Sequence, residues 1–253
     1  MIDFKTPEEL KKMRKGGKIL AQVLQETLLN AKPGITEIEL ETIADRLIME
    51  KGGEAAFKKV PGYKWATCIS TNDVVVHGIP SDYKLKDGDI IGIDCGVYLD
   101  GYYTDMSDSL RVGGKKGDET DKFLETGKKA LLAGISQAKP GNKIGHISKA
   151  IQDIVEKEGG YSVVRSLIGH GVGKTLHEDP EVPGYLKGKI ENTPELKPGM
   201  TIAIEVIYNM GKYEVSFANH DGWTIVTSDG TISGLYERTV AITKSGNEIL
   251  TRV

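Results

Sequence analysis

The sequence repeats one plan twice, and this repeat constrains the fold more than any single motif does. The tetrapeptide Ala-Lys-Pro-Gly at Ala31–Gly34 recurs at Ala138–Gly141, and the pair Gly52–Gly53 recurs at the same offset as Gly159–Gly160. Apolar positions between these landmarks also correspond, which indicates two helices with similar buried faces. The repeat is too large, and has too few copies, for a solenoid. It predicts two α+β halves related by a pseudo-two-fold axis, with their strands meeting centrally.

The first half contains two helix starts. Thr6, Pro7 and Glu9 match an N-cap, a proline at the first helical position and a capping-box glutamate, and an apolar stripe continues to about residue 30. A second capping box, formed by Thr36 and Glu39, begins a helix that we expect to reach the following glycine pair.

A β-hairpin is predicted where the dipeptide Asp100-Gly101 separates two β-prone runs. A two-residue turn there places Asp94 opposite Ser107, with Asp105 diagonal to Asp94 on the same face. Asp108 then points to the other face. Two carboxylates facing each other repel unless a cation or proton lies between them. The hairpin alone leaves two alternatives open: a metal site, or surface aspartates beside a turn.

The second half supplies further candidates. Residues 196–205 repeat the pattern of residues 85–94, so that Glu205 aligns with Asp94. His170 lies among glycines, whose small size allows a ligand or a neighbouring backbone to approach closely. The surrounding residues match neither a phosphate loop nor a dinucleotide-binding motif, and no helical zinc motif is present. Glu237 opens a β-branched run, and such a residue alone is more often solvated than functional.

Composition excludes several function classes. The net charge of −3 gives no electrostatic footprint for nucleic acid or a membrane surface. No apolar run approaches the roughly 20 residues of a transmembrane helix, and the N-terminus lacks the pattern of a signal peptide. The two cysteines, Cys68 and Cys95, lie in strand-like runs, as is typical of a reducing compartment. We therefore expect a cytoplasmic protein.

Five stretches, in this order, together resemble the type I methionine aminopeptidases, in their short bacterial form. They are Ser70–Pro80, the pair Asp94 and Asp105, Gly169–Glu178, Ile204–Glu205 and Tyr236–Glu237. The resemblance covers essentially the whole chain. It implies an α+β pita-bread (creatinase/aminopeptidase) fold, with two pseudo-symmetric halves around a central antiparallel sheet and helices on the outside. The chain would form a single catalytic domain, 1–253, with halves at approximately 1–115 and 116–253.

The resemblance implies a centre of two divalent metal ions. Its ligands would be Asp94, Asp105, His170, Glu205 and Glu237, with Asp105 and Glu237 bridging the two ions, Asp94 binding one, and His170 and Glu205 binding the other. Charge counting supports this independently, because two divalent cations balance four carboxylates. Oxygen ligands with one imidazole suit Co, Mn, Fe or Zn, and the sequence does not choose among them.

The implied reaction removes the N-terminal methionine from nascent proteins and peptides, with a preference for a small second residue. Two metal ions would activate water and polarise the scissile carbonyl. Glu205 would move a proton, His177 would donate to the developing oxyanion, and His77 would contact the peptide nitrogen. Taken singly, either histidine is also consistent with a hydrogen-bonded core or loop residue. His220 would at most line the rim of the pocket.

By the same resemblance, Tyr63, Cys68 and Trp223 would line the methionine pocket with polarisable, apolar surface. From the residues alone, each is also consistent with ordinary core, which is the default for Cys68 and Trp223 because they lie in strand-like runs. The chain departs from the usual family pattern at four positions, which puts substrate preference and rate in doubt more than reaction type. These positions are Val60, Leu176, Val206 and Arg238. Arg238 would place a fixed cation beside the metals.

Two other readings compete with an aminopeptidase. Proline dipeptidases resemble this chain in the ligand set but carry a large N-terminal domain, and non-catalytic pita-bread binding proteins typically lose metal ligands. The expected partners are N-terminal Met peptides and nascent chains. The ribosome is a further candidate partner, which the sequence neither supports nor excludes. We expect no direct contact with nucleic acid or membrane, and a monomer.

Overall fold

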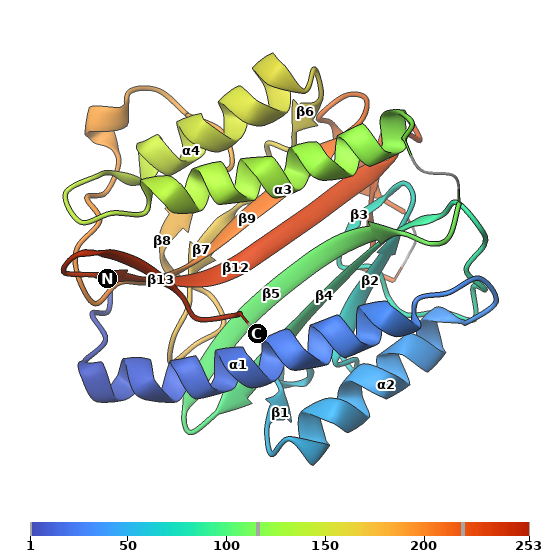
Figure 1. Cartoon of the computed structure of the whole chain (residues 1–253), viewed down its shortest axis with the longest axis horizontal. Coiled ribbons are helices and arrows are strands. Elements are labelled where there is room, and N and C mark those ends of the chain that lie inside the picture. The colour runs from blue at the N-terminus through green and yellow to red at the C-terminus, as the bar shows by residue number, and fades with distance from the viewer. Residues whose placement is uncertain (1, 115–116, 219–220, 253) are drawn as a thin grey trace.

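The computed structural model describes residues 2–114, 117–218 and 221–252. The helices cover one face of a ten-stranded sheet (Figure 1), and a separate three-stranded sheet packs against the other face. The elements in chain order are α1 (Pro7–Asn30), α2 (Glu37–Glu50), β1 (Glu54–Ala55), η1 (Phe57–Lys59), β2 (Thr67–Thr71), β3 (Val74–Val76), β4 (Ile90–Leu99), β5 (Tyr102–Arg111), α3 (Glu119–Gln137), α4 (Ile144–Gln152), the π-helix η2 (Asp153–Glu158), β6 (Ser162–Val163), β7 (Gly169–Gly171), β8 (Glu178–Val182), η3 (Ile190–Asn192), β9 (Thr201–Asn209), β10 (Val215–Phe217), β11 (Ile225–Thr227), β12 (Ser233–Thr243) and β13 (Gly246–Ile249).

Both predicted capping boxes are confirmed. Thr6 and Glu9 exchange side-chain and backbone hydrogen bonds at the start of α1, and Thr36 and Glu39 do the same at the start of α2. Helix α2 ends at Glu50, slightly before the glycine pair at which we expected it to stop. Local hydrogen bonding therefore fixes where these helices begin.

The predicted hairpin is also confirmed. Strand β4 ends at Leu99 and β5 begins at Tyr102, and the two residues between them, Asp100 and Gly101, have positive φ values of 50° and 91°. Positive φ at both central positions is the geometry that matches the twist of the flanking strands. The pairing places Asp94 opposite Ser107, as the turn predicts.

The main path of the large sheet runs β1-β4-β5-β12-β9-β7-β8, with antiparallel pairing between neighbours. Strands β5 and β12 are central. Helix α1 packs over β4 and β5, and α3 packs over β9 and β12, so that a helix of each half covers the strands of that half (Figure 1).

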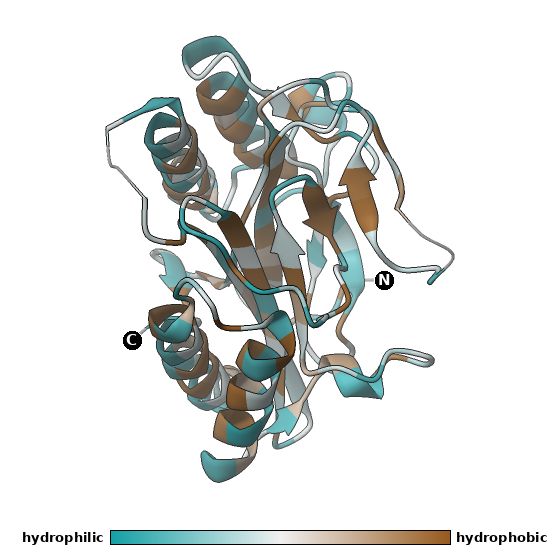
Figure 2. Ribbon diagram, turned by 90° about the vertical axis from the view of Figure 1, so that its right-hand side faces the viewer, coloured by the Kyte–Doolittle hydropathy of each residue, from teal (hydrophilic) through white to brown (hydrophobic). Residues whose placement is uncertain are grey.

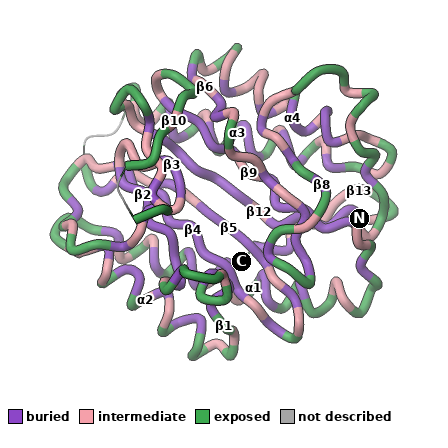
Figure 3. Tube along the Cα trace, turned by 180° about the vertical axis from the view of Figure 1, so that it is seen from behind, coloured by how far each residue is buried: buried purple, intermediate pink, exposed green. Residues whose placement is uncertain are grey.

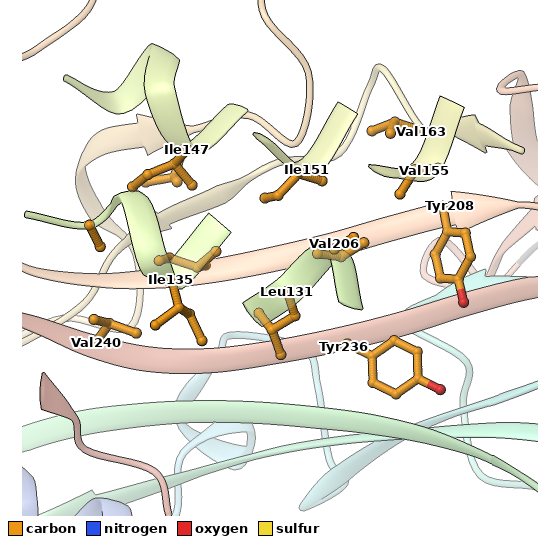
Figure 4. Packing of buried hydrophobic residues seen from close by; sticks show 14 of the residues in the cluster. Leu131, Ile135, Ile147, Ile151, Val155, Val163, Val206, Tyr208, Tyr236 and Val240 are labelled. Carbon is orange, nitrogen blue, oxygen red and sulfur yellow. The ribbon is translucent and has the colours of Figure 1, made fainter. Parts of the chain in front are cut away.

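Side chains alternate between the two faces of the central strands. In β9 and β12 the even-numbered residues, among them Val206, Tyr208, Tyr236 and Val240, pack with α3 and α4 (Figure 4). The odd-numbered residues point to the face away from the helices, because successive side chains in a strand alternate. Loops and the small sheet lie over that second face (Figure 2). The central strands are accordingly buried along most of their length (Figure 3).

No helix among the described residues is long and apolar enough to cross a membrane.

Candidate active site

Five predicted ligand residues lie on the face of the sheet away from the helices, in two neighbouring rows that cross the strands. In the first row, Asp94 on β4 pairs with Ser107 on β5, Ser107 pairs with Glu237 on β12, and Glu237 pairs with Glu205 on β9. The strand register alone therefore brings three carboxylates from distant parts of the chain onto one line.

The second row carries Asp105 and His170. Asp105 and Thr239 exchange hydrogen bonds of 2.8 and 2.9 Å, Thr239 pairs with Ala203, and Ala203 pairs with His170 on β7. Glycine makes this close packing possible, because a Cβ on Gly169 would collide with the carbonyl oxygen of Ala203. The small residues beside His170 thus admit a neighbouring strand.

The His170 ring is oriented toward two carboxylates. Its Nδ1 lies 2.8 Å from the carbonyl oxygen of Gly171, to which it donates, leaving Nε2 as the free nitrogen. Nε2 lies 3.9 Å from both Asp105 Oδ2 and Glu237 Oε1. One ligand atom from each of these three residues falls within 4.8 Å of the others, a spacing that could hold a metal ion.

Burial and mutual repulsion disfavour the charged forms of the carboxylates. Burial raises the pKa of Asp105 to about 7, and burial together with the nearby Asp105 raises the pKa of Glu205 to about 8. The pKa values of Asp94 and Glu237 are also raised well above their usual range, first by burial and then by the neighbouring acids. Burial, and then the proximity of His177, lower the pKa of His170 to about 4, so that its imidazole is neutral.

These residues fit divalent metal ions. Oδ1 of Asp94 and Oε1 of Glu237 are buried without a hydrogen-bond partner among the described residues. No lysine or arginine is among the described residues that line the pocket. Unpaired buried oxygens with one neutral imidazole are a donor set that divalent first-row metals accept.

The ligand residues form the floor of a cavity of about 630 Å³. One end of the cavity is apolar, because Tyr63, Cys68 and Leu176 pack there with Phe57, and Trp223 is in contact with them. Trp223 and Tyr63 lie edge to face with ring centroids 5.0 Å apart, and the Tyr63 hydroxyl donates to the carbonyl oxygen of Thr67 at 2.8 Å. The three predicted pocket residues therefore share one cavity with the predicted ligands.

The two other predicted histidines also line this cavity. The ring centroids of His177 and His170 are 4.4 Å apart. His77 directly follows β3 in a left-handed backbone conformation, with φ of 56°, which is uncommon for a residue other than glycine. Burial lowers the pKa of His77 and of His177. Both rings can therefore be neutral donors or acceptors at neutral pH.

Three expectations need correction. Glu237 does not open a strand but lies within β12, with 1 % of its surface exposed, because both faces of that strand are covered. Trp223 does not lie in a strand but in the turn before β11, where its backbone N–H donates to Asp221 Oδ1 at 2.8 Å. Arg238 points to the helix side of the sheet, where it forms an ion pair of 2.8 Å with Asp108. The carboxylate of Asp108, with which Arg238 pairs, thus lies on the face opposite the predicted ligands, because successive side chains in a strand alternate between faces.

The other departures from the family pattern have separate surroundings. Leu176 and Val60 lie at the apolar end of the cavity. Val206 is buried beneath α3 and α4. His220 lies outside the described residues.

Several residues of the cavity were missed by sequence reasoning. Phe57, Leu167 and Ile207 add apolar wall, and Glu178 and Glu181 of β8 add acidic groups at its edge. Glu178 directly follows His177, so the motif that contains His177 could have indicated that Glu178 also lies at the cavity. The apolar residues gave none, because strand and loop residues of this kind are also typical of ordinary core.

Comparisons with known proteins agree with this geometry. The sequence model of metallopeptidase family M24 matches residues 11–244 of the chain. Methionine aminopeptidase 1 of Bacillus subtilis is 46 % identical over 254 residues, with 100 % of both chains covered.

Solved structures show the same fold. The crystal structure of a methionine aminopeptidase from Thermotoga maritima matches with a TM-score of 0.95 at 39 % identity, covering 100 % of both chains. A prolidase from Pyrococcus furiosus matches with a TM-score of 0.77 at 25 % identity, covering 99 % of this chain and 65 % of that one. The fold is the pita-bread fold, and the larger size of the prolidase agrees with the extra domain that we expected of proline dipeptidases.

Proposed function

The chain belongs to metallopeptidase family M24, and we propose that it removes the N-terminal methionine from peptides and nascent proteins, with a preference for a small second residue. The observation that carries the proposal is the shared cavity: buried carboxylates and His170 form its floor, and an apolar cluster around Tyr63 forms its end. In the proposed binding mode, the methionine side chain would contact this cluster and the terminal amine of the same residue would lie near the carboxylates.

We propose two divalent metal ions as cofactors, with Co, Mn, Fe and Zn as candidates. Asp94, Asp105, His170, Glu205 and Glu237 would hold these ions, with Asp105 and Glu237 contributed by the two central strands. When bound, such ions supply positive charge that polarises a carbonyl group and makes water nucleophilic near neutral pH.

The other polar residues of the cavity handle the substrate and its protons. His177 donates a hydrogen bond to the carbonyl oxygen as negative charge develops on it. Glu205 accepts a proton from the attacking water and passes it to the leaving nitrogen. His77 contacts the peptide nitrogen of the scissile bond and holds the substrate in place. Tyr63, Cys68 and Trp223 contact the methionine side chain.

We propose that residues 1–253 act as a single catalytic domain with halves at approximately 1–115 and 116–253. We further propose that the protein is a cytoplasmic monomer that acts on nascent chains. The ribosome is then a candidate partner, because nascent chains emerge from it.

A peptide panel tests the proposed reaction. Met-Gly-x and Met-Lys-x peptides are incubated with the purified protein and added Mn, Fe or Co, and release of free methionine is measured. We expect rapid cleavage of Met-Gly-x, slow cleavage of Met-Lys-x, and none of the acetylated Met-Gly-x control, whose amine is blocked. Efficient cleavage of x-Pro dipeptides without cleavage of Met-Gly-x would select a proline dipeptidase instead. No cleavage with any metal, and a metal content near zero, would reject both.

A further inference from the structure

We propose that Lys5 is a positioning residue for His177, acting through Glu178, so that the N-terminal segment sets the geometry of the active site. The inference rests on the proposed function for the role of His177. Two segments are involved: residues 3–9, here called the N-terminal clasp, and residues 173–178, here called the His177 loop. They are far apart in the sequence, and the loop presents both Leu176 and His177 to the cavity.

The contact between the two segments is a buried ion pair. Nζ of Lys5 lies 2.5 Å from Oε2 of Glu178, and the two side chains are 1 % and 13 % exposed. The backbone of the clasp is fixed as well, because Lys5 N–H donates to the carbonyl oxygen of Gly199 at 2.7 Å. A charge pair removed from water in this way keeps its geometry, since separating the partners would leave each buried and unpaired.

Glu178 passes this constraint to the loop. Its Oε1 accepts a hydrogen bond of 3.0 Å from the backbone N–H of Thr175. The Thr175 hydroxyl in turn donates to the carbonyl oxygen of His177 at 3.0 Å, and Gly173 N–H donates to the carbonyl oxygen of Thr175 at 3.0 Å. A chain of hydrogen bonds therefore connects the Lys5 ammonium to the backbone that carries His177.

The packing is close at the same point. A Cβ on Gly173 would lie 2.3 Å from Cε and 2.5 Å from Nζ of Lys5, so the loop backbone passes directly over the lysine side chain. Lys174 forms a second link, with Nζ 3.4 Å from Asp3 and 3.3 Å from Glu9. Its side chain is 56 % exposed, and exposed pairs contribute little. The Lys5–Glu178 pair is thus the main connection.

Loop position matters to the reaction because His177 acts by geometry. A hydrogen-bond donor stabilises a developing charge only from a fixed place, and a misplacement of about 1 Å can cost about a hundredfold in rate. The His177 ring is packed edge to face against His170, which leaves little latitude on that side. Loss of the Lys5 charge should therefore misplace the donor while leaving the predicted ligands where they are.

Lys5→Met tests the proposal, since it keeps the chain length and removes the charge. We expect kcat for Met-Gly-x to fall about ten- to hundredfold, with little change in KM and an unchanged metal content. Lys5→Arg should recover most of the activity. The matched control is Lys149→Met, which removes an exposed lysine paired with Asp153 on α4 and should behave as wild type.

A double-mutant cycle separates positioning from general destabilisation. If Lys5 acts through His177, Lys5→Met should add little further loss of kcat to His177→Ala. Additive losses would overturn the proposal. Because Lys5→Met leaves the carboxylate of Glu178 largely buried without its cation, Lys5→Met with Glu178→Leu is made as well. That variant should recover thermal stability but not kcat, and recovery of both would assign the pair a purely structural role.

Hydrogen exchange provides a readout without catalysis. The amide of Thr175 should exchange faster in Lys5→Met than in wild type or Lys149→Met. Equal exchange rates would overturn the proposal that Lys5 restrains the His177 loop. This measurement separates two failures. If wild type fails to cleave Met-Gly-x, the proposed function is wrong whatever the exchange rates are. If wild type cleaves it and Lys5→Met has equal kcat, the positioning role alone is wrong.

Discussion

Asp94 and Glu205 stand at opposite ends of one row of residues that crosses the four central strands of the sheet, with Ser107 and Glu237 between them. The sequence repeat aligns the same two residues, each ending a strand-like run that follows a Leu-Lys-x-Gly turn. Equivalent positions of the two halves thus face a common centre. Because acidic side chains converge from both halves, removal of one should affect a site that they all share.

Asp105→Asn should abolish activity and lower the metal content. The change removes the charge of a proposed metal ligand while keeping the size of the side chain. Since loss of residues that only support a ligand costs about 10–100-fold, we expect a loss of more than about a hundredfold. Metal analysis and kcat on Met-Gly-x measure the effect. Asp108→Asn is the matched control, because Asp108 lies three residues on but pairs with Arg238 on the helix side. Normal metal content in Asp105→Asn would refute the ligand assignment.

The contrast between these two aspartates is what the sequence could predict. A two-residue turn and the strand period fix which side chains share a face, and both are local properties. Burial of Glu237 could not be predicted this way, because it depends on what covers each side of β12. The Lys5–Glu178 pair joins residues 173 positions apart, and no local pattern indicates such a contact. The turn that holds Trp223 likewise depends on Asp221, whose carboxylate accepts from two backbone N–H groups.

Removal of metal by a chelator should inactivate the protein and lower its thermal stability. Without cations, the buried carboxylates of Asp94, Asp105 and Glu237 and the half-buried carboxylate of Glu205 lie close together, and protonation relieves their repulsion. Ligand present at a hundredfold excess over its Kd stabilises a fold by about 2.7 kcal/mol, which for a domain of this size corresponds to a Tm shift of roughly 5–10 °C. Calorimetry with and without Mn measures the shift. An unchanged Tm, with activity lost, would argue against metal binding at this buried centre.

Glu9 should control stability at acid pH. The Tyr102 hydroxyl and the Thr6 N–H donate to its carboxylate at 2.6 and 2.8 Å, and they lower its pKa from 4.5 to about 2. A carboxylate with a lowered folded pKa stabilises the fold fully above its unfolded pKa, and this contribution is lost as pH falls through the folded value. The window is therefore pH 4.5 to about 2. Glu9→Gln should lower stability at pH 7 and flatten its fall across this window in urea titrations. Glu8→Gln on the same helical turn is the control, and an identical acid profile for both variants would contradict the assignment.

His170 and His177 should respond differently to substitution, although their rings are only 4.4 Å apart. His170 donates through Nδ1 to Gly171 and directs Nε2 toward Asp105 and Glu237, which is the orientation of a ligand. His170→Ala should therefore lose both metal and activity. His177 would act only on the substrate oxygen, so His177→Ala should keep its metal while kcat falls about 10²–10³-fold and KM changes less.

Metal content and kinetics measured on the same preparations decide between the two roles. Loss of metal from His177→Ala would make it a ligand, and full metal content in His170→Ala would remove that histidine from the centre. Either result would change which residue faces the scissile carbonyl, because the two rings occupy neighbouring parts of one cavity and only one of them has its Nε2 between the central carboxylates.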